Sequence, residues 1–288
     1  MKKLTLLLGL ICIAAFTFGQ GNTSTVLQDG HANVATVKQI GINNDAFMNL
    51  VGEGNWIWQC QTGFNNVESF VVMNGNFNRT WSAEYFWTPT NWKFYTKFLY
   101  DPSNTQHQFG CSNTALAYID LSDHNLVSQT QGYKYFGLWS DLNEAVINIT
   151  NFSHYNKVMQ AQLGLSNHVF VNIDDNSTWN NILTHQKGQD NFVTVNISDY
   201  SDGNKVGITQ GCMYNWAIGN TAFVQITDIT DDNEFVINQK DFYNYAEILA
   251  NYNSDDNIMS IHQEGWSGNY AHIQLEQWAI DNIISICQ

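Results

Sequence analysis

Residues 180–210 read NNILTHQKGQDNFVTVNISDYSDGNKVGITQ and contain three consecutive copies of one short unit. Each copy begins with an asparagine (Asn180, Asn191 and Asn204), and the residues two and four positions later are mostly aliphatic. Alternation of this kind over about six residues is typical of a β-strand with one buried face. The stretch therefore predicts short strands joined by tight arcs, and it shows no helical period.

The same unit recurs along most of the chain. A residue six positions after each asparagine divides the later units into two classes, because it is alternately glutamine and aliphatic from Asn113 to Asn282. Strict alternation of two classes means that the structural period is two strands, or about 24 residues. The asparagines that begin a unit are Asn22, Asn33, Asn44, Asn55, Asn66, Asn78, Asn113, Asn125, Asn143, Asn156, Asn167, Asn180, Asn191, Asn204, Asn220, Asn233, Asn244, Asn257, Asn269 and Asn282.

This repeat predicts an all-β fold, namely a β-solenoid with cross-β stacking. Each rung would hold two strands, and residues 20–288 would form a single domain of about ten rungs, stacked at the ordinary strand spacing. Like residues of successive rungs would then lie directly above one another.

Stacking gives the amides a structural role. A buried amide can donate a hydrogen bond to one neighbouring rung and accept one from the other, so a column of amides satisfies itself except at its ends. The residues that we expect in this structural amide ladder are Asn33, Asn44, Asn55, Asn167, Asn180, Asn191, Asn204, Asn233, Asn257, Asn282, Gln162, Gln186, Gln210, Gln239 and Gln263.

Three insertions interrupt the spacing, near residues 84–110, 132–141 and 211–218. Their positions predict that all three leave from one edge of the solenoid, on the arc after a glutamine-class strand. Their aromatic content allows two interpretations: a composite patch that binds a protein or a glycan, or loops that fold back and cover the sheet. The candidate binding residues are Trp87, Trp92, Tyr95, Tyr133, Trp139, Tyr214 and Trp216.

The first 19 residues have the pattern of a secretory signal peptide. A basic start, Met1–Lys3, precedes an apolar run from residue 4 to residue 18, which is short for a membrane span. We therefore expect a secreted or cell-surface protein without a membrane span. Four cysteines would remain after cleavage, and an even count permits two disulfides as well as buried free thiols. The sequence leaves the pairing open among Cys60, Cys111, Cys212 and Cys287.

The composition argues against several functions. The net charge is −15 with only 11 Lys and Arg residues, so we expect no binding to nucleic acid, which needs clustered cations. No nucleophile, phosphate-loop or metal-ligand motif is present, so we expect no enzyme activity, no cofactor and no metal site. Aspartates before several strands could hold Ca²⁺ or simply favour turns, and the second interpretation is the simpler one. These are Asp175, Asp202, Asp232, Asp256 and Asp281.

One unit matches a known repeat at every fixed position. Gln28, Gly30, Asn33, Ala35 and Gln39 have the spacing Gln-x-Gly-x-x-Asn-x-Ala followed, after three residues, by Gln. In this respect the chain resembles the curlin repeat family, and the resemblance covers nearly all of the expected mature chain. Other copies depart from the pattern, with aliphatic residues in some of the fixed positions. Two such copies are Gln108, Gly110, Asn113, Ala115 and Ile119, and Gln186, Gly188, Asn191, Val193 and Ile197.

The resemblance implies a subunit of an extracellular amyloid-like fibre that serves adhesion and the biofilm matrix. Its partners would be copies of itself, stacked head to tail, or other curlin-like subunits, together with the outer-membrane export machinery. Repeat units lie close to both ends of the sequence, which favours head-to-tail stacking. The aromatic insertions favour a minor or nucleating subunit. The alternative is a secreted solenoid that does not polymerise and binds a glycan or a protein through its aromatic loops.

Overall fold

The computed structural model describes residues 21–64, 69–75, 79–80, 106–131, 142–211, 217–227, 230–251, 254–265, 268–275 and 280–288. Throughout these residues the regular structure consists of β-strands and contains no helix. Accordingly, no helix in the described part of the chain could cross a membrane. The all-β class predicted from the alternating pattern is confirmed.

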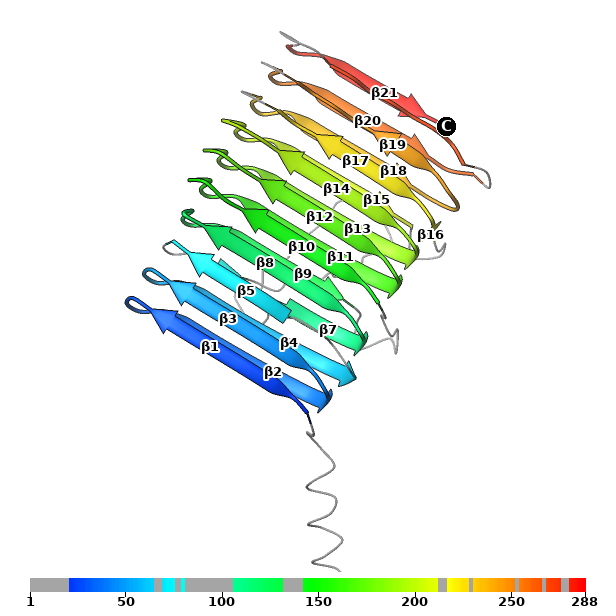
Figure 1. Cartoon of the computed structure of the whole chain (residues 1–288). Helices are drawn as coiled ribbons and strands as arrows, with labels where there is room; N and C mark the ends of the chain where they lie inside the picture. The colour runs from blue at the N-terminus through cyan, green and yellow to red at the C-terminus, as the bar shows by residue number, and fades with distance from the viewer. Residues whose placement is uncertain are drawn as a thin grey trace, which may run out of the picture.

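The strands form two sheets, and every strand pairs in parallel with the strands of the neighbouring rungs (Figure 1). Sheet A contains β1 (Thr23–Asp29), β3 (Asp45–Val51), β5 (Ser69–Asn74), β8 (Thr114–Asp120), β10 (Glu144–Ile149), β12 (His168–Ile173), β14 (Phe192–Ile197), β17 (Thr221–Gln225) and β19 (Tyr245–Glu247). Sheet B contains β2 (Val34–Ile42), β4 (Trp56–Phe64), β6 (Arg79–Thr80), β7 (Gln106–Cys111), β9 (Leu126–Gln131), β11 (Lys157–Leu165), β13 (Asn181–Gln189), β15 (Lys205–Gln210), β16 (Ala217–Ile218), β18 (Glu234–Gln239), β20 (Ile258–Gln263) and β21 (Ile283–Cys287).

Over most of the chain, consecutive strands alternate between the two sheets, so the polypeptide winds as a β-solenoid. Between β10 and β15 the register advances by 24 residues per rung, as in the pairing of Glu144 with His168 and of Gln162 with Gln186. Parallel, in-register pairing of this kind places each side chain above its equivalent in the previous rung.

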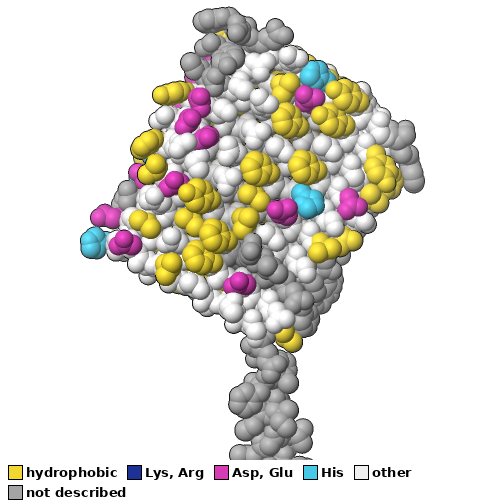
Figure 2. Space-filling view, in the orientation of Figure 1, with side chains coloured by type: hydrophobic (Ala, Val, Ile, Leu, Met, Phe, Trp, Pro, Cys, Tyr) yellow, Lys and Arg dark blue, Asp and Glu magenta, His cyan; other side chains and the backbone are white. Residues whose placement is uncertain are grey.

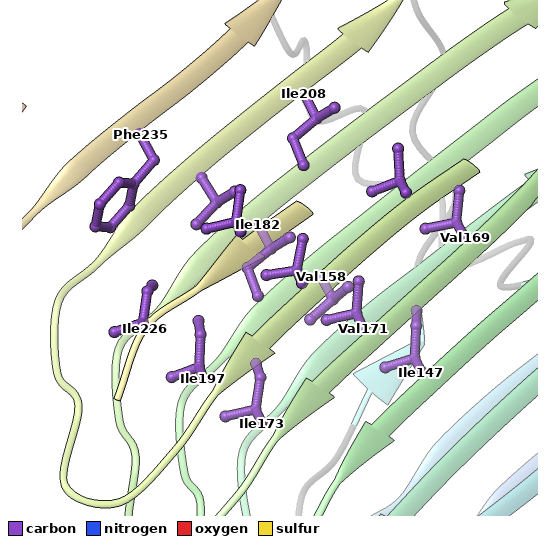
Figure 3. Close-up of a cluster of buried hydrophobic side chains, with 14 of the residues drawn as sticks. Ile147, Val158, Val169, Val171, Ile173, Ile182, Ile197, Ile208, Ile226 and Phe235 are labelled. Carbon is purple, nitrogen blue, oxygen red and sulfur yellow. The ribbon is translucent and has the colours of Figure 1, made fainter. Parts of the chain in front are cut away.

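The hydrophobic core lies between the sheets and continues along the solenoid axis (Figure 3). Ile149 pairs with Ile173, and Ile173 pairs with Ile197, so the aliphatic class of the repeat forms one column inside sheet A. All three side chains are fully buried. Burying each of them contributes about 1.5–3 kcal/mol relative to exposure, which makes this column a major source of stability.

The arcs turn through residues with positive φ. Gly164, at the end of β11, has φ 120°, and a Cβ placed on it would lie 1.9 Å from the carbonyl oxygen of Gly188 in the next rung. Only glycine fits this position, because a side chain would meet backbone of the adjacent arc. This is the structural reason for the glycine in the Gln-x-Gly-x-x-Asn unit.

The largest insertion corrects the prediction that all three leave from one edge. The chain leaves sheet B after β6 and returns at β7, and both strands pair with β4 on one side and β9 on the other. This insertion therefore interrupts a strand of sheet B, and its predicted last residues, 106–110, belong to β7. The alternation of glutamine-class and aliphatic-class units could not be counted across an insertion that begins inside a strand. The two shorter insertions follow β9 and β15, on the predicted arc from sheet B to sheet A.

Candidate functional site: the amide columns

A continuous hydrogen-bonded ladder of glutamines runs along sheet B. In each step the Nε2 atom of one glutamine donates to the Oε1 atom of the glutamine in the next rung, over 2.8–3.1 Å. We call this set the Gln ladder. Its members are Gln39, Gln61, Gln108, Gln131, Gln162, Gln186, Gln210, Gln239, Gln263 and Gln288.

The ladder glutamines also close the arcs that lead to sheet A. Gln162 Nε2 donates to the carbonyl oxygen of Asn167 at 2.8 Å, and Gln131 Nε2 donates to that of Asn143 at 3.0 Å. The side chains from Gln61 to Gln263 are fully buried, whereas Gln39 is half-buried and Gln288 is exposed. Through these hydrogen bonds each glutamine connects two successive rungs and also connects its strand in sheet B to the arc that follows.

The asparagines form two further columns, one beside each sheet. Column A precedes the strands of sheet A, and its members are Asn22, Asn44, Asn113, Asn143, Asn167, Asn191, Asn220, Asn244 and Asn269. Column B precedes the strands of sheet B, and its members are Asn33, Asn55, Asn125, Asn156, Asn180, Asn204, Asn233, Asn257 and Asn282. The predicted ladder residues are thus divided between two asparagine columns and one glutamine ladder.

Asn180 shows the bonding that repeats along column B. Its Nδ2 atom donates to Asn156 Oδ1 in the previous rung at 3.1 Å and to the carbonyl oxygen of Ser201 in the next rung. Its Oδ1 atom accepts from the backbone N–H and the Nδ2 atom of Asn204, at 3.0 and 3.1 Å. The side chain is fully buried, and these bonds offset the cost of burying an amide.

Within each column all amide–amide hydrogen bonds run in one direction along the solenoid axis, and the Gln ladder runs opposite to the two asparagine columns. In the Gln ladder the donor points toward the rung nearer the C-terminus, and in both asparagine columns Nδ2 points toward the rung nearer the N-terminus. The two end faces consequently carry different atoms of the same columns. Gln39 Oε1 lies at the N-terminal end of the ladder, and Gln288 Nε2 lies at its C-terminal end.

A hydroxyl column beside column B was missed from the sequence. Ser177 Oγ accepts from the backbone N–H of Ser201 at 3.2 Å, and Ser153 Oγ accepts from that of Ser177 at 3.3 Å. The signal was present, because a serine or threonine stands three residues before most column B asparagines in the second half. The column members are Ser122, Ser153, Ser177, Ser201, Thr230 and Ser254, all fully buried.

A second feature that the sequence reasoning missed is an aromatic stack on the arc between sheets A and B. The rings of Tyr155 and Trp179 are stacked with centroids 4.6 Å apart, and His124 stacks on Tyr155 at 4.8 Å. All three residues have positive φ, where glycine, asparagine or aspartate would be less strained. Their positions directly before column B asparagines could have revealed the stack.

The predicted aromatic binding residues lie outside the described residues. These are Trp87, Trp92, Tyr95, Tyr133, Trp139, Tyr214 and Trp216. Of the predicted cysteines, Cys212 also lies outside, Cys60 and Cys111 lie in β4 and β7, and Cys287 is an exposed free thiol.

Carboxylates gather on the arc before the last column B asparagines. Asp202, Asp231 and Asp255 stand at equivalent positions of successive rungs, and burial together with these neighbouring carboxylates raises the pKa of Asp231. No group of three or more potential metal ligands is arranged to hold an ion within the described part of the chain. The arrangement is that of backbone-capping side chains, since Asp202 Oδ1 accepts from the N–H and the hydroxyl of Thr178 at 2.6 and 2.8 Å.

Comparison with known proteins gives one family match. The family model of the curlin associated repeat matches residues 19–49, which include the unit that begins at Asn33 and the following Asn44. The resemblance to the curlin repeat is thereby confirmed for this part of the chain, and that repeat belongs to extracellular fibre-forming proteins of the curli type. No curated protein and no solved structure matches the chain.

Proposed function

We propose, on the premise that residues 19–49 are a curlin associated repeat, that this protein is a subunit of an extracellular curli-like fibre. The fibre grows by axial stacking of solenoids, and it serves adhesion and the biofilm matrix. The observation that carries the proposal is the uninterrupted Gln ladder, which links equivalent glutamines from β2 to the end of the solenoid beyond β21. A further solenoid placed on either end would continue the ladder by the same contact.

The outermost strands have the features of a template for stacking. Every side chain of β1 is exposed, and Ile283 in β21 is 79% exposed, whereas its register partner Ile258 in β20 is 44% exposed. Among the strands that the structure describes, β21 pairs with β20 alone. An outer strand offers its unpaired backbone N–H and C=O groups to another chain, which is the property that cross-β assembly uses.

The direction of the columns favours head-to-tail over head-to-head stacking. When the C-terminal face of one copy meets the N-terminal face of the next, Gln288 Nε2 meets Gln39 Oε1 as donor and acceptor. The same contact brings Asn282 Oδ1 to the Nδ2 atom and backbone N–H of Asn33. Two identical faces would instead oppose donor with donor and acceptor with acceptor, which leaves desolvated polar groups without partners. The fibre therefore has two different ends, because every copy points in the same direction along the axis.

Fibre formation tests this function directly. Protein comprising residues 20–288 should assemble into fibres with a cross-β reflection near 4.7–4.8 Å, and should seed its own assembly. Gln288→Glu would place a carboxylate against Gln39 Oε1 of the next copy and should slow elongation at least about tenfold, the equivalent of roughly 1.4 kcal/mol.

The matched control is Gln189→Glu, because Gln189 is an exposed glutamine outside the Gln ladder. This variant should elongate like the unmodified protein. A protein that stays monomeric under all seeding conditions would refute the proposed fibre, and equal elongation by the two variants would refute the axial contact.

A further inference from the structure

The outer face of sheet A has an apolar column along its centre. Neighbouring positions in the register are Phe47, Phe70, Leu116, Val146 and Phe170, and the rings of Phe47 and Phe70 are stacked with centroids 4.8 Å apart. Figure 2 shows hydrophobic side chains distributed over this face, with acidic side chains and two histidines among them. Thr194 interrupts this column in β14, and the outward-facing Asn148 and Asn172 lie beside it, so the apolar surface is a stripe across five strands. A contiguous apolar stripe of this kind marks an interaction surface.

The two sheets differ in charge, because the described cations are confined to one of them. Strands of sheet A carry outward-facing Asp45, Glu144 and Glu247 and contain no Lys or Arg among the described residues, in agreement with the view in Figure 2. All described cations lie in strands of sheet B or directly after one. They are Lys38, Arg79, Lys157, Lys187, Lys205 and Lys240. Sheet B also carries Glu234, the register partner of Lys205, and Glu264 follows β20 directly and pairs with Lys240 at 2.8 Å. The cations outnumber these carboxylates and leave the sheet B face net positive, so the two faces are electrostatically complementary, although the chain as a whole is acidic.

A groove of about 290 Å³ lies on the acidic face, over β10, β12 and β14. It is lined by Glu144, Val146, His168, Phe170, Phe192 and Thr194. His168 Nδ1 lies 3.1 Å from Glu144 Oε2, and the imidazole lies 6.5 Å from the ring of Phe192. Aromatic rings beside a carboxylate suit a cationic side chain, which they bind by cation–π attraction and ion pairing. On sheet B, Lys38 and Lys205 are exposed and able to reach such a groove.

The size of the face matches that of a specific protein interface. Nine strands at about 4.8 Å, each about six residues long at about 3.3 Å, cover roughly 850 Å², close to the roughly 800 Å² per partner of a standard interface. Because both faces repeat at the same strand spacing, columns of one copy can lie along columns of another over the full height.

We propose that sheet A of one copy packs side by side against sheet B of a second copy, with lysines of sheet B facing the acidic groove. Two sheet A faces would bring their carboxylates together, so the contact joins unlike faces. A contact between unlike faces leaves one free face on each partner and therefore propagates. This lateral contact goes beyond the axial stacking proposed above, since it uses the faces of the solenoid and not its ends.

Charge reversal on each face tests the lateral contact. The sheet A variant combines Glu144→Lys and Glu247→Lys, and the sheet B variant is Lys205→Glu. Each variant alone should reduce the width of fibre bundles at least about twofold in electron micrographs, at unchanged fibre length. An equimolar mixture of the two variants should restore the width, because the reversed faces complement each other. Thermal melting checks that each variant is folded, and Glu144→Gln with Glu247→Gln is the milder substitute if reversal prevents folding.

Glu53→Lys is the control, because Glu53 is an exposed carboxylate on the arc between β3 and β4 and not on either face. It should leave bundle width unchanged. Bundles of normal width from the face variants, or narrow bundles from the control, would overturn the proposal. So would a sheet A variant that keeps its bundles and loses binding to a polysaccharide, which would make the face a glycan site. If no fibres form, sedimentation should still show side-by-side association that both face variants abolish, so the axial and lateral proposals fail separately.

Discussion

A buried glutamine is stable in this solenoid because its neighbours above and below complete its hydrogen bonds. Gln186 accepts from Gln162 at 3.0 Å, donates to Gln210 at 2.9 Å and donates to the carbonyl oxygen of His168 at 3.0 Å. Each bond contributes about 1 kcal/mol net, but leaving one buried partner unsatisfied costs about 1–3 kcal/mol. The ladder therefore specifies register more strongly than it adds stability.

Replacing Gln186 by Leu should test this energetic asymmetry. Gln210 Oε1 would lose its donor inside the core, so we expect the free energy of unfolding to fall by roughly 2–3 kcal/mol. Denaturant unfolding of the monomer measures the change. Gln189→Leu, at an exposed glutamine outside the Gln ladder, serves as the control and should cost less than about 0.5 kcal/mol. Equal losses at the two positions would contradict the ladder as the cause.

His185 should make stability depend on pH. Burial, with a smaller effect of the neighbouring Lys187, lowers the pKa of His185 from 6.5 to about 4. Because the folded-state pKa is depressed, the unfolded chain binds a proton first, and stability is lost as the pH falls from about 6.5 toward 4. We expect a loss on the order of 2 kcal/mol across this window, measured by denaturant midpoints at several pH values. In His185→Gln the loss of stability between pH 6.5 and pH 4 should be smaller by about this amount. An unchanged loss would exclude His185 as its source.

At the scale of elements, the arcs decide where side chains are tolerated. The turn at Gly164 combines φ 120° with a neighbouring carbonyl oxygen that a Cβ would approach within 1.9 Å. Gly207 lies inside β15, and a methyl group placed on it would have the carbonyl oxygen of Phe235 as its nearest neighbour, 4.0 Å away. Gly164 therefore has no room for a Cβ atom, whereas Gly207 does.

Alanine at these two glycines gives a matched pair of variants. Gly164→Ala should destabilise the protein by about 3 kcal/mol or more, because the clash involves backbone that cannot move without breaking the stack. Gly207→Ala should be neutral or stabilising by up to about 1 kcal/mol, since it removes unfolded-state freedom at a position with room. Melting temperatures of the two variants check the difference in sign. A similar loss in both would show that the arc at Gly164 is adaptable.

Much of this element order could be predicted from spacing alone. The alternation of glutamine with isoleucine, as in Gln186 and Ile197, assigns each strand to a sheet, because a rung of two unlike strands repeats its side chains every second unit. The serine column and the aromatic stack were not predicted, because their residues lie in the arcs, outside the strand alternation, although both recur at fixed distances before column B asparagines. The exit point of the large insertion could not be found either, because Thr80 and Gln106 lie within one interrupted strand and no asparagine marks the break.

On the scale of the whole molecule, the solenoid should behave as a stack of exchangeable rungs, in which each rung contacts only its neighbours. The column contacts within it are the same from rung to rung, so removal of one full period should bring equivalent residues together. Deleting residues 180–203 would place Asn204 after Trp179, and would join Gln162 to Gln210 and Asn167 to Asn220 through bonds that already exist between other rungs.

We therefore expect the protein lacking residues 180–203 to fold cooperatively and to melt only a few degrees lower, since one rung of several is lost. Deleting residues 180–190 removes half a period and is the decisive comparison. It would move β14 into sheet B and place Ile197 at the position of Gln186 in the Gln ladder. Gln162 Nε2 would then lack an acceptor amide in the next rung, and Gln210 Oε1 would lack a donor amide in the previous one. That shorter deletion should abolish cooperative unfolding even though it removes fewer residues. If circular dichroism melting shows the half-period deletion to be as stable as the full-period one, the side-chain columns do not determine the register of the solenoid.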